Sequence, residues 1–311
     1  MLEGNRRARQ INTTVGPRGP SGPVVYVMSR DQRVADNWAL LSAQSLAGEI
    51  GTTLQVVALL VPGVRPGARR HFEFKVRGLE EVEVALQKYN IPFTLLIGND
   101  SFEVLKRSLE VTQPSAVVYD FNPLRVSAEC VQQLGAYLEK QGVPLYQVDA
   151  HNIVPAWVAS PKLEIGARTL RPKIHRLMPE FLTAYPKLAV QKLPTENALP
   201  PTNWTRVRKE AKVDETVPAV DWIAPGEKAA KQALKKFLEE RLPGYAVKRN
   251  DPTLDHQSDL SPYLHFGQLS AQRIALEVIA SRAPQVDKDA YLEELIVRRE
   301  LADNFVLYNA A

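Results

Sequence analysis

Hydrophobic and polar positions alternate in blocks between residues 24 and 148. Short runs of apolar, largely β-branched residues are separated by longer stretches with helical spacing. The runs predict strands at Val24–Met28, Leu54–Val61, Phe93–Ile97, Ala116–Asp120 and Leu145–Val148, and the stretches predict helices over Asp36–Ile50, Val76–Tyr89, Ser101–Glu110 and Ser127–Gln141. Strands that are apolar throughout and alternate with helices indicate a doubly wound parallel sheet, so the first domain is α/β.

The segment Ser29–Arg33 directly follows the first predicted strand. It therefore lies at the carboxyl edge of the predicted sheet, where open α/β sheets bind ligands. The chain has no G-x-G-x-x-G or Walker motif, so an ordinary dinucleotide or triphosphate site is not indicated.

The pattern changes after residue 150. Residues 152–225 are rich in proline and lack sustained periodicity, and helical spacing resumes at about Gly226. The first helix there has one apolar face, made of Ala230, Ala233, Leu234, Phe237 and Leu238. We expect a disordered basic tail over 1–22, an α/β domain over 23–195, a linker over 196–225 and the first part of an all-α domain over 226–311.

The segment Ser258–Ser270 contains clustered hydroxyls and two helix-start signals. Ser261 is placed to cap a helix that begins at Pro262, Gly267 ends that helix, and Ser270 is placed to cap a second helix that runs to about Ser281. One interpretation is two ordinary capped helices. The other is a phosphate site, because a helix start presents free N–H groups and the positive end of the dipole.

A helix predicted over Asp289–Tyr308 is apolar on most sides, which is typical of a buried helix. It nevertheless carries Glu294 with Arg298 and Arg299 with Asp303, each pair at i,i+4 and hence on one face. The pairs are either salt bridges on a solvated face or part of a polar pocket that this helix and Ser258–Ser270 enclose, because buried charges need partners.

Composition places the chain among soluble globular proteins. With 311 residues, 45% hydrophobic and 24% charged, it is long enough for two domains. The single cysteine, Cys130, on an expected surface helix, excludes a disulfide framework. No apolar run of about 18 residues predicts a membrane span, and the first 22 residues lack the apolar core of a secretory signal.

The net charge of +4 is unevenly distributed. Residues 160–213 hold 11 Lys and Arg against 4 acidic residues, a surplus of 7. Such a segment suits either contact with a phosphate backbone or a solvated linker. No histidine has metal-ligand spacing, and no Ser/His/Asp arrangement is recognisable. Trp157, Trp204 and Trp222 are interpreted as packing residues or linker anchors rather than redox relays, and Trp38 as a core residue rather than an antenna contact.

Several longer motifs occur in one order along the chain. They are Met28–Leu41, Asp120–Arg125, Val148–Pro155, Ala167–Ile174, Tyr245 with Arg249–Pro252, Leu260–Ser270 and Glu294–Glu300. Together they resemble the DNA photolyase and cryptochrome family, most closely class II cyclobutane pyrimidine dimer photolyases. The resemblance covers nearly everything after residue 23. Family members continue beyond this point through the rest of a helical domain, so the resemblance implies a C-terminally truncated chain with an incomplete flavin domain.

The resemblance implies an FAD site in the helical part. In the family the α/β part can hold an antenna pigment, and the sequence indicates neither its identity nor whether one binds. Carried over by motif, the residues that would contact the cofactor are Tyr245, Gln257, Ser258, Asp259, Leu260, Ser261, Tyr291, Arg298 and Leu301. Glu294 matches the carboxylate that hydrogen-bonds a thymine of the dimer. Arg249, Glu294 and Arg298 would face nucleic acid.

The implied activity is that of a deoxyribodipyrimidine photo-lyase, in which excited, reduced FAD donates an electron that splits the dimer. The implied partner is ultraviolet-damaged DNA. The protein is expected to bind it as a monomer, and no association with a membrane is expected. The expected location is the cytoplasm, or the nucleus in a eukaryote. Two other functions stay open: a cryptochrome-like flavin photoreceptor, and a photolyase fragment without catalysis.

Overall fold

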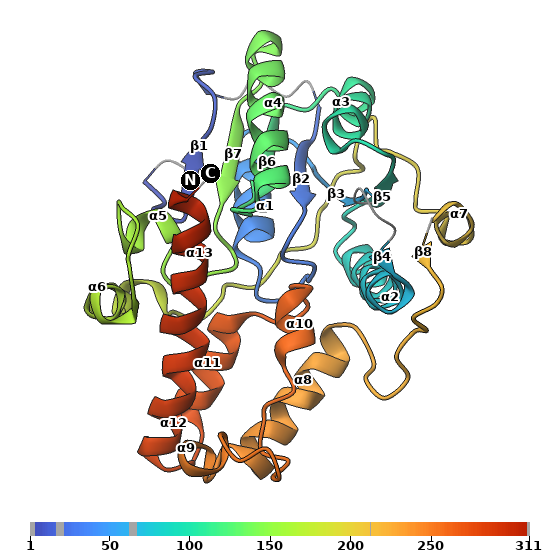
Figure 1. Ribbon diagram of the computed structural model, residues 1–311. Coiled ribbons are helices and arrows are strands. Elements are labelled where there is room, and N and C mark those ends of the chain that lie inside the picture. Colours follow the sequence, from blue (N-terminus) through green and yellow to red (C-terminus); the bar gives the residue numbers. More distant parts are fainter. Residues whose placement is uncertain (1–3, 17–21, 62–66, 212, 310–311) are drawn as a thin grey trace.

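The structure, a computed structural model, describes residues 4–16, 22–61, 67–211 and 213–309. A six-stranded sheet organises the first half of the chain (Figure 1), with strand order β1-β7-β6-β2-β3-β5. The strands are β1 (Ala8–Gln10), β2 (Val24–Met28), β3 (Leu54–Leu60), β5 (Phe93–Ile97), β6 (Ala116–Asp120) and β7 (Leu145–Val148). All pairs are parallel except β1 with β7, which confirms the predicted α/β sheet.

Helices cover both faces of this sheet. On one face, α1 (Trp38–Glu49) and α2 (Arg69–Gln87) pack against alternate strand residues, such as Tyr26 and Val56. On the other face, α3 (Ser101–Thr112) and α4 (Arg125–Gln141) cover the intervening residues, such as Val25 and Val57. Because both faces are buried, the strands need apolar residues at every position, which is why they read as continuous runs.

The second half of the chain is helical. Its core is separate from the sheet and is built by α6 (Ala167–Phe181), α8 (Glu227–Lys236), η1 (Phe237–Arg241), α9 (Tyr245–Lys248), α10 (Ser261–His265), α11 (Ala271–Ala280), α12 (Gln285–Leu292) and η2 (Glu293–Arg298). α12, η2 and α13 (Arg299–Tyr308) follow one another directly and form the long rod seen in Figure 1. The predicted face of the first helix is correct at Ala230, Leu234 and Phe237, which are buried.

The segment that crosses between the two halves is more structured than its composition indicates. It contains α5 (Ala156–Ala159), α6, α7 (Trp204–Glu210) and β8 (Val213–Asp214), which pairs with β4 (Gly67–Ala68). α6 carries Pro172 and Pro179, and these residues broke the sequence pattern. Trp204 stacks on Phe93 at 6.4 Å between ring centroids. Trp222, by contrast, is 74% exposed, so it is not a core residue.

The prediction of a disordered tail over residues 1–22 is wrong for residues 4–16. β1 covers the outer edge of β7. Arg7 is 4% exposed, and its guanidinium donates to the carbonyls of Ile153 at 2.8 Å and Phe181 at 2.9 Å. Arg7 also donates to Gln272 at 3.0 Å. A buried guanidinium is tolerated where its N–H groups find acceptors, and here those acceptors come from the folded helical half.

Cys130 was predicted to lie on a surface helix, and the structure corrects this prediction. It is buried among residues that cover β6, and burial raises the pKa of its thiol to about 11. Such a thiol stays protonated and is a poor nucleophile at neutral pH.

Candidate functional site

An aromatic cluster in the core of the helical half contains two of the predicted site residues, Tyr245 and Tyr291. The ring centroids of Phe237 and Tyr291 lie 4.6 Å apart, and those of Tyr245 and Tyr291 lie 5.2 Å apart. All three side chains are buried. Burial raises the pKa of Tyr291, although its bond to Ser258 partly opposes that shift. The structure therefore brings together Tyr245, Ser258 and Tyr291, which are separate in the sequence.

The hydroxyl-rich loop before α10 is held by Arg241. Its guanidinium donates to the carbonyl of Gln257 at 2.9 Å, pairs with Asp255 at 2.8 Å and also pairs with Asp259. Asp259 has a left-handed backbone, with φ +56°, and Asp tolerates this conformation better than most residues. Leu260, next along the loop, is fully buried. The loop is thus clamped at three points and anchored at its end.

The helix-start predictions in this region are partly correct. Pro262 lies in the first turn of α10, as predicted, but Ser261 is already helical and the N-cap residue is Leu260, which makes no side-chain cap bond. Ser261 is therefore not the predicted cap. Ser270 does cap α11, because its hydroxyl accepts the N–H of Arg273 at 3.2 Å.

Glu294 does not pair with Arg298, which corrects the first predicted i,i+4 pair. Its carboxylate binds the Arg249 guanidinium at 2.9 Å and is 43% exposed. Arg298 instead approaches Glu293 at 3.5 Å. The reason is local geometry: residues 293–298 form a π-helical turn, in which residues five apart become neighbours.

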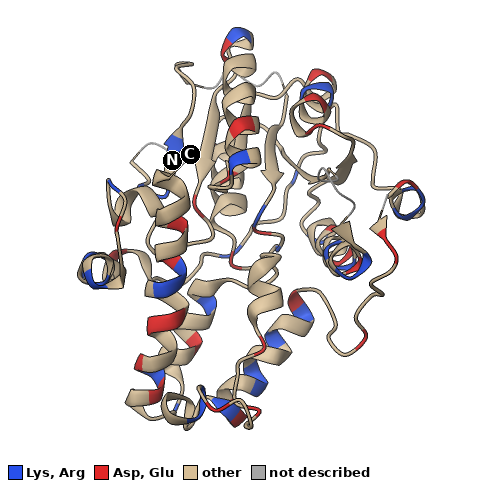
Figure 2. Ribbon diagram, viewed as in Figure 1, with Lys and Arg blue, Asp and Glu red and all other residues tan. Residues whose placement is uncertain are grey.

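Glu293 joins η2 to α6. Arg171 holds its carboxylate with two bonds, of 3.0 Å and 2.7 Å. The side chain of Arg298 remains 55% exposed, and Leu301 packs partly buried on the helical core. In Figure 2, α6 carries several cationic residues beside this rod. The predicted site residues therefore lie on α9, α12, η2 and α13, and on α10 with the loop that precedes it.

The second predicted pair is also corrected. Asp303 does not pair with Arg299 but binds Arg30 through two bonds, of 2.8 Å and 2.9 Å. Arg299 donates to the carbonyl of His151 at 3.1 Å and lies 3.5 Å from Glu300. Burial opposes ionisation of Asp303, but Arg30 outweighs it and lowers the pKa of that carboxyl to about 2. Asp303 and Arg299 thus bond to Arg30 and to the carbonyl of His151, and not to each other.

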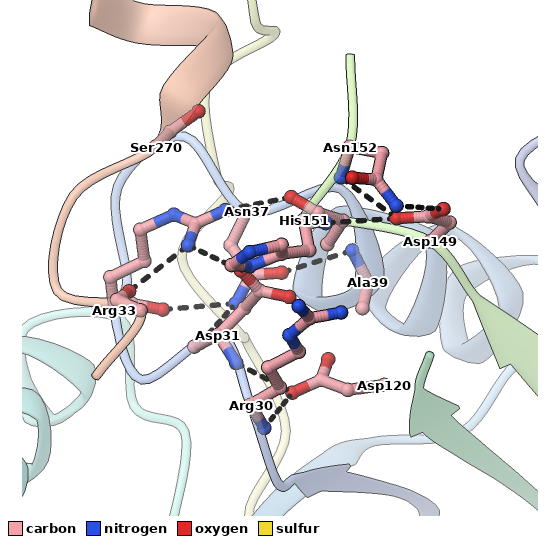
Figure 3. Close-up of polar contacts among 12 residues, drawn as sticks. Arg30, Asp31, Arg33, Asn37, Ala39, Asp120, Asp149, His151, Asn152 and Ser270 are labelled. Carbon is pink, nitrogen blue, oxygen red and sulfur yellow. Dashed lines mark hydrogen bonds and ion pairs between the residues drawn. The ribbon is translucent and has the colours of Figure 1, made fainter. Parts of the chain in front are cut away.

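A buried polar junction that the sequence did not reveal lies at the carboxyl ends of β2, β6 and β7 (Figure 3). The carboxylate of Asp120 accepts the Tyr26 hydroxyl at 2.6 Å and the backbone N–H groups of Ser29, Arg30 and Asp31 at 2.9–3.0 Å. Burial, aided by the charge of Asp31, raises the pKa of Asp120 to about 7. The sequence placed Ser29–Arg33 at this edge, and in the structure the backbone N–H groups of Ser29, Arg30 and Asp31 are bound by Asp120.

Arg33 is the centre of that junction. It is fully buried and reaches Asp31 at 2.6 Å, the carbonyl of Ala150 at 2.9 Å and the carbonyl of Gly267 at 3.0 Å. Burial acts to raise the pKa of Asp31, but Arg33 and His151 outweigh it and hold that pKa below its ordinary range. The junction therefore ties the sheet edge to the turn between α10 and α11.

Glu300, on α13, is a buried carboxyl whose two oxygens differ in their hydrogen bonding. One carboxyl oxygen accepts the N–H of Ile153 at 2.6 Å, and the other has no hydrogen-bond partner among the described residues. Burial raises the pKa of Glu300 to about 8. The carboxyl is therefore largely protonated at neutral pH.

Two cavities lie against the sheet. One, of about 420 Å³, lies beyond the carboxyl ends of β3 and β5 and is lined by Leu60, Ile97, Lys75 and Phe266, among others. Lys75 donates to the carbonyl of Leu59 at 2.8 Å, and burial lowers its pKa to about 8. The other, of about 740 Å³, lies between α4, β7 and the end of α13.

Within the described ranges, His, Cys, Asp and Glu form no group of three or more that could hold a metal ion. In the same part of the chain, no helix is long and apolar enough to cross a membrane.

Comparisons with known proteins agree along most of the chain. A family model described as DNA photolyase matches residues 24–195. Proteins named deoxyribodipyrimidine photo-lyase from Potorous tridactylus and from Oryza sativa subsp. japonica are 43% and 44% identical. The matches cover 98% and 93% of this chain, but 57% and 59% of the relatives. The chain thus spans less than two thirds of the length of these relatives.

Two solved structures share the fold. A class III photolyase from Agrobacterium tumefaciens superposes with a TM-score of 0.71 at 19% identity and covers 95% of this chain and 61% of its own. A cryptochrome from Synechocystis gives 0.70 at 17% identity, with 92% and 62% covered. At this identity the two structures support the architecture alone.

Proposed function

The chain belongs to the DNA photolyase family, and on that premise we propose that it acts in light-driven repair of cyclobutane pyrimidine dimers in DNA. The observation that carries the proposal is the 43% identity, along 98% of this chain, to a protein named deoxyribodipyrimidine photo-lyase. Two contacts between residues that the motifs predicted support it: Tyr245 packs against Tyr291, and Arg249 binds Glu294.

FAD is the cofactor of the proposal, and the residues present suit it. Arg249 has a buried Nε with no partner among the described residues, and its guanidinium carbon lies 5.8 Å from the ring centroid of Tyr245. An unpaired donor beside hydroxyls suits an anionic phosphate. The residues proposed to hold the cofactor are Tyr245, Gln257, Ser258, Asp259, Leu260, Ser261, Tyr291, Arg298 and Leu301. When bound and excited by light, the flavin supplies an electron donor.

Glu294 is the residue proposed to recognise the lesion. Its carboxylate is exposed to solvent and is held by Arg249 at 2.9 Å, so it is oriented before any substrate arrives. A preorganised hydrogen-bonding group favours the species whose charge it matches. Arg298, exposed on the same turn, and Arg249 would face the nucleic acid.

The partner of the proposal is ultraviolet-damaged DNA, bound by a monomer in the compartment that holds the DNA, the cytoplasm or the nucleus. Residues 160–213 carry a surplus of positive charge, and cationic residues line α6 beside the site (Figure 2). Such residues supply affinity for phosphates that does not depend on sequence.

An antenna pigment, if the chain uses one, is proposed to bind in the cavity beyond β3 and β5. Open α/β sheets bind ligands beyond the carboxyl ends of their strands. Lys75, whose pKa is lowered to about 8 by burial, lines this cavity and offers a donor to an acidic pigment.

The test is reconstitution of the purified chain with excess FAD, followed by desalting and an absorbance spectrum. Retained flavin at one equivalent, with dimer loss from irradiated DNA under blue light, is the expected result. Retained flavin without light-dependent repair would favour a photoreceptor. Loss of flavin on desalting would contradict cofactor binding by this chain and favour a fragment without catalysis.

A further inference from the structure

The short helix α9 is not stable in isolation. It has four residues, Tyr245–Lys248, and isolated helices of this length are unstable because nucleation costs more than one turn returns. It follows Gly244, whose φ of +87° is left-handed. Its first N–H groups have no intrahelical acceptors, so something outside the helix must satisfy them.

The N–H of Tyr245 donates to the carbonyl of Leu242 at 3.1 Å, and Asp287, on α12, supplies acceptors for two further N–H groups of this turn. One carboxylate oxygen accepts the N–H of Gly244 at 2.8 Å, and the other accepts the N–H of Ala246 at 2.8 Å. The side chain is 3% exposed. Both oxygens are therefore committed to one turn that lies 41 to 43 residues earlier in the chain.

The position of Asp287 in its own helix explains why it is free to do this. It is the third residue of α12, where an acidic side chain often bonds back to the N–H of the N-cap residue. Here the N-cap residue is Pro284, which has no N–H. The carboxylate is thus left without that local partner and reaches across to α9.

The turn that Asp287 holds carries two of the proposed site residues. Tyr245 begins α9 and packs edge-on against Tyr291 at 5.2 Å between centroids. Arg249 follows α9 and binds Glu294 at 2.9 Å. A shift of this turn would therefore move Tyr245 and Arg249, the partner of Glu294, together.

We propose that Asp287 is a positioning residue of the flavin site: it fixes the α9 turn, and through that turn it places Tyr245 for the cofactor and Arg249 for Glu294. This inference rests on the proposed function for the identity of the ligand. It goes beyond it in assigning a role to a residue that is predicted to touch neither flavin nor DNA.

The experiment compares the chain with its Asp287→Asn variant. Asparagine keeps the shape and one acceptor oxygen but turns an NH₂ group toward the second backbone N–H. Asp289→Asn is the matched control, because Asp289 lies exposed on the same helix and accepts only from Gln285, at 2.7 Å. Amide hydrogen exchange of residues 244–249 and the dissociation constant for FAD are measured for each.

We expect faster exchange at Gly244 and Ala246 in Asp287→Asn, with exchange in the sheet unchanged. We also expect FAD binding to weaken about tenfold, which corresponds to about 1.4 kcal/mol. Asp289→Asn should change neither quantity. Unchanged exchange at both amides would overturn the inference, whether or not FAD binds.

A double-mutant cycle separates positioning from general loss of structure. If Asp287 acts through Tyr245, its substitution should cost less FAD affinity in a Tyr245→Phe background than in the native chain. Equal costs in both backgrounds would overturn positioning through Tyr245. Absence of FAD binding by the native chain would count against the proposed function, and the exchange measurement would then still decide the role of Asp287 in the turn.

Discussion

Arg30, at the end of the first parallel strand, and Asp303, on the last helix, form a two-bond ion pair across 273 residues of sequence. The N–O distances are 2.8 Å and 2.9 Å, and both side chains are largely buried. Asn152 adds a third contact to Asp303 at 2.9 Å. The pair joins the sheet edge to the helical rod and so holds that rod against the α/β half.

Asp303→Asn should destabilise the protein by about 3 kcal/mol, because removing one partner of a buried ion pair leaves the other charge uncompensated. Chemical denaturation followed by circular dichroism measures this. Asp251→Asn, on an exposed turn, is the control and should change stability little. A loss below about 0.5 kcal/mol for Asp303→Asn, the range of surface substitutions, would contradict the importance of the pair.

The same pair predicts acid sensitivity. The pKa of Asp303 is lowered in the folded protein to about 2, from 3.8. The stabilisation is therefore fully present above about pH 4 and is lost as the pH falls toward 2. Denaturation between pH 2.5 and 5 should show this loss in the native chain, and the Asp303→Asn variant should show a smaller slope in that window.

Glu300 predicts the opposite dependence on pH. Burial raises its pKa to about 8 in the folded protein, from 4.5. The folded state therefore holds a proton that the unfolded state releases, and the contribution of this group to stability falls as the pH rises from 4.5 through 8. Glu300→Gln, which is neutral at every pH, should reduce the loss of stability between pH 6 and 8.5. Identical slopes for both proteins would refute the raised pKa.

From the buried hydrogen bonds of Arg7 we expect the N-terminal segment to contribute to the stability of the protein. Arg7→Met keeps an apolar stem but removes the guanidinium that satisfies the carbonyls of Asn152, Ile153 and Phe181. Buried acceptors left unpaired cost about 1–3 kcal/mol, so we expect a loss in that range by urea denaturation. Arg6→Met, at an exposed neighbour, should be nearly neutral, since exposed ion pairs contribute little.

Glu294→Gln tests lesion recognition. Hydrogen bonds that involve a charged group contribute about 1.5–3 kcal/mol, so we expect preference for dimer-containing over intact DNA to fall about tenfold, together with the repair yield. FAD affinity should fall less than this preference does, because glutamine has the same size and keeps one acceptor oxygen for Arg249. Unchanged discrimination and unchanged repair in the variant would remove Glu294 from the proposal.

Local patterns predicted much of the architecture. Strand β2 begins and ends where the apolar run does, because a strand buried on both faces needs an unbroken run of apolar residues. Ser270 was identified as a cap from its place before a helical pattern, and it is one. The order of the motifs also identified the family. These features depend only on neighbours in the chain.

What the sequence determined by itself is therefore periodicity, capping and family membership; what only the tertiary structure decided is which charges meet. Glu294 bonds to Arg249 and Asp303 bonds to Arg30, although each has an oppositely charged residue four positions away. A π-helical turn changes which residues are neighbours on the rod, and the packed sheet edge offers buried partners. Asp287 bonds to the α9 turn, because the N-cap residue of its own helix, Pro284, has no N–H to offer it. A charge takes the partner that best compensates its loss of water, and that choice depends on which surfaces the fold brings together.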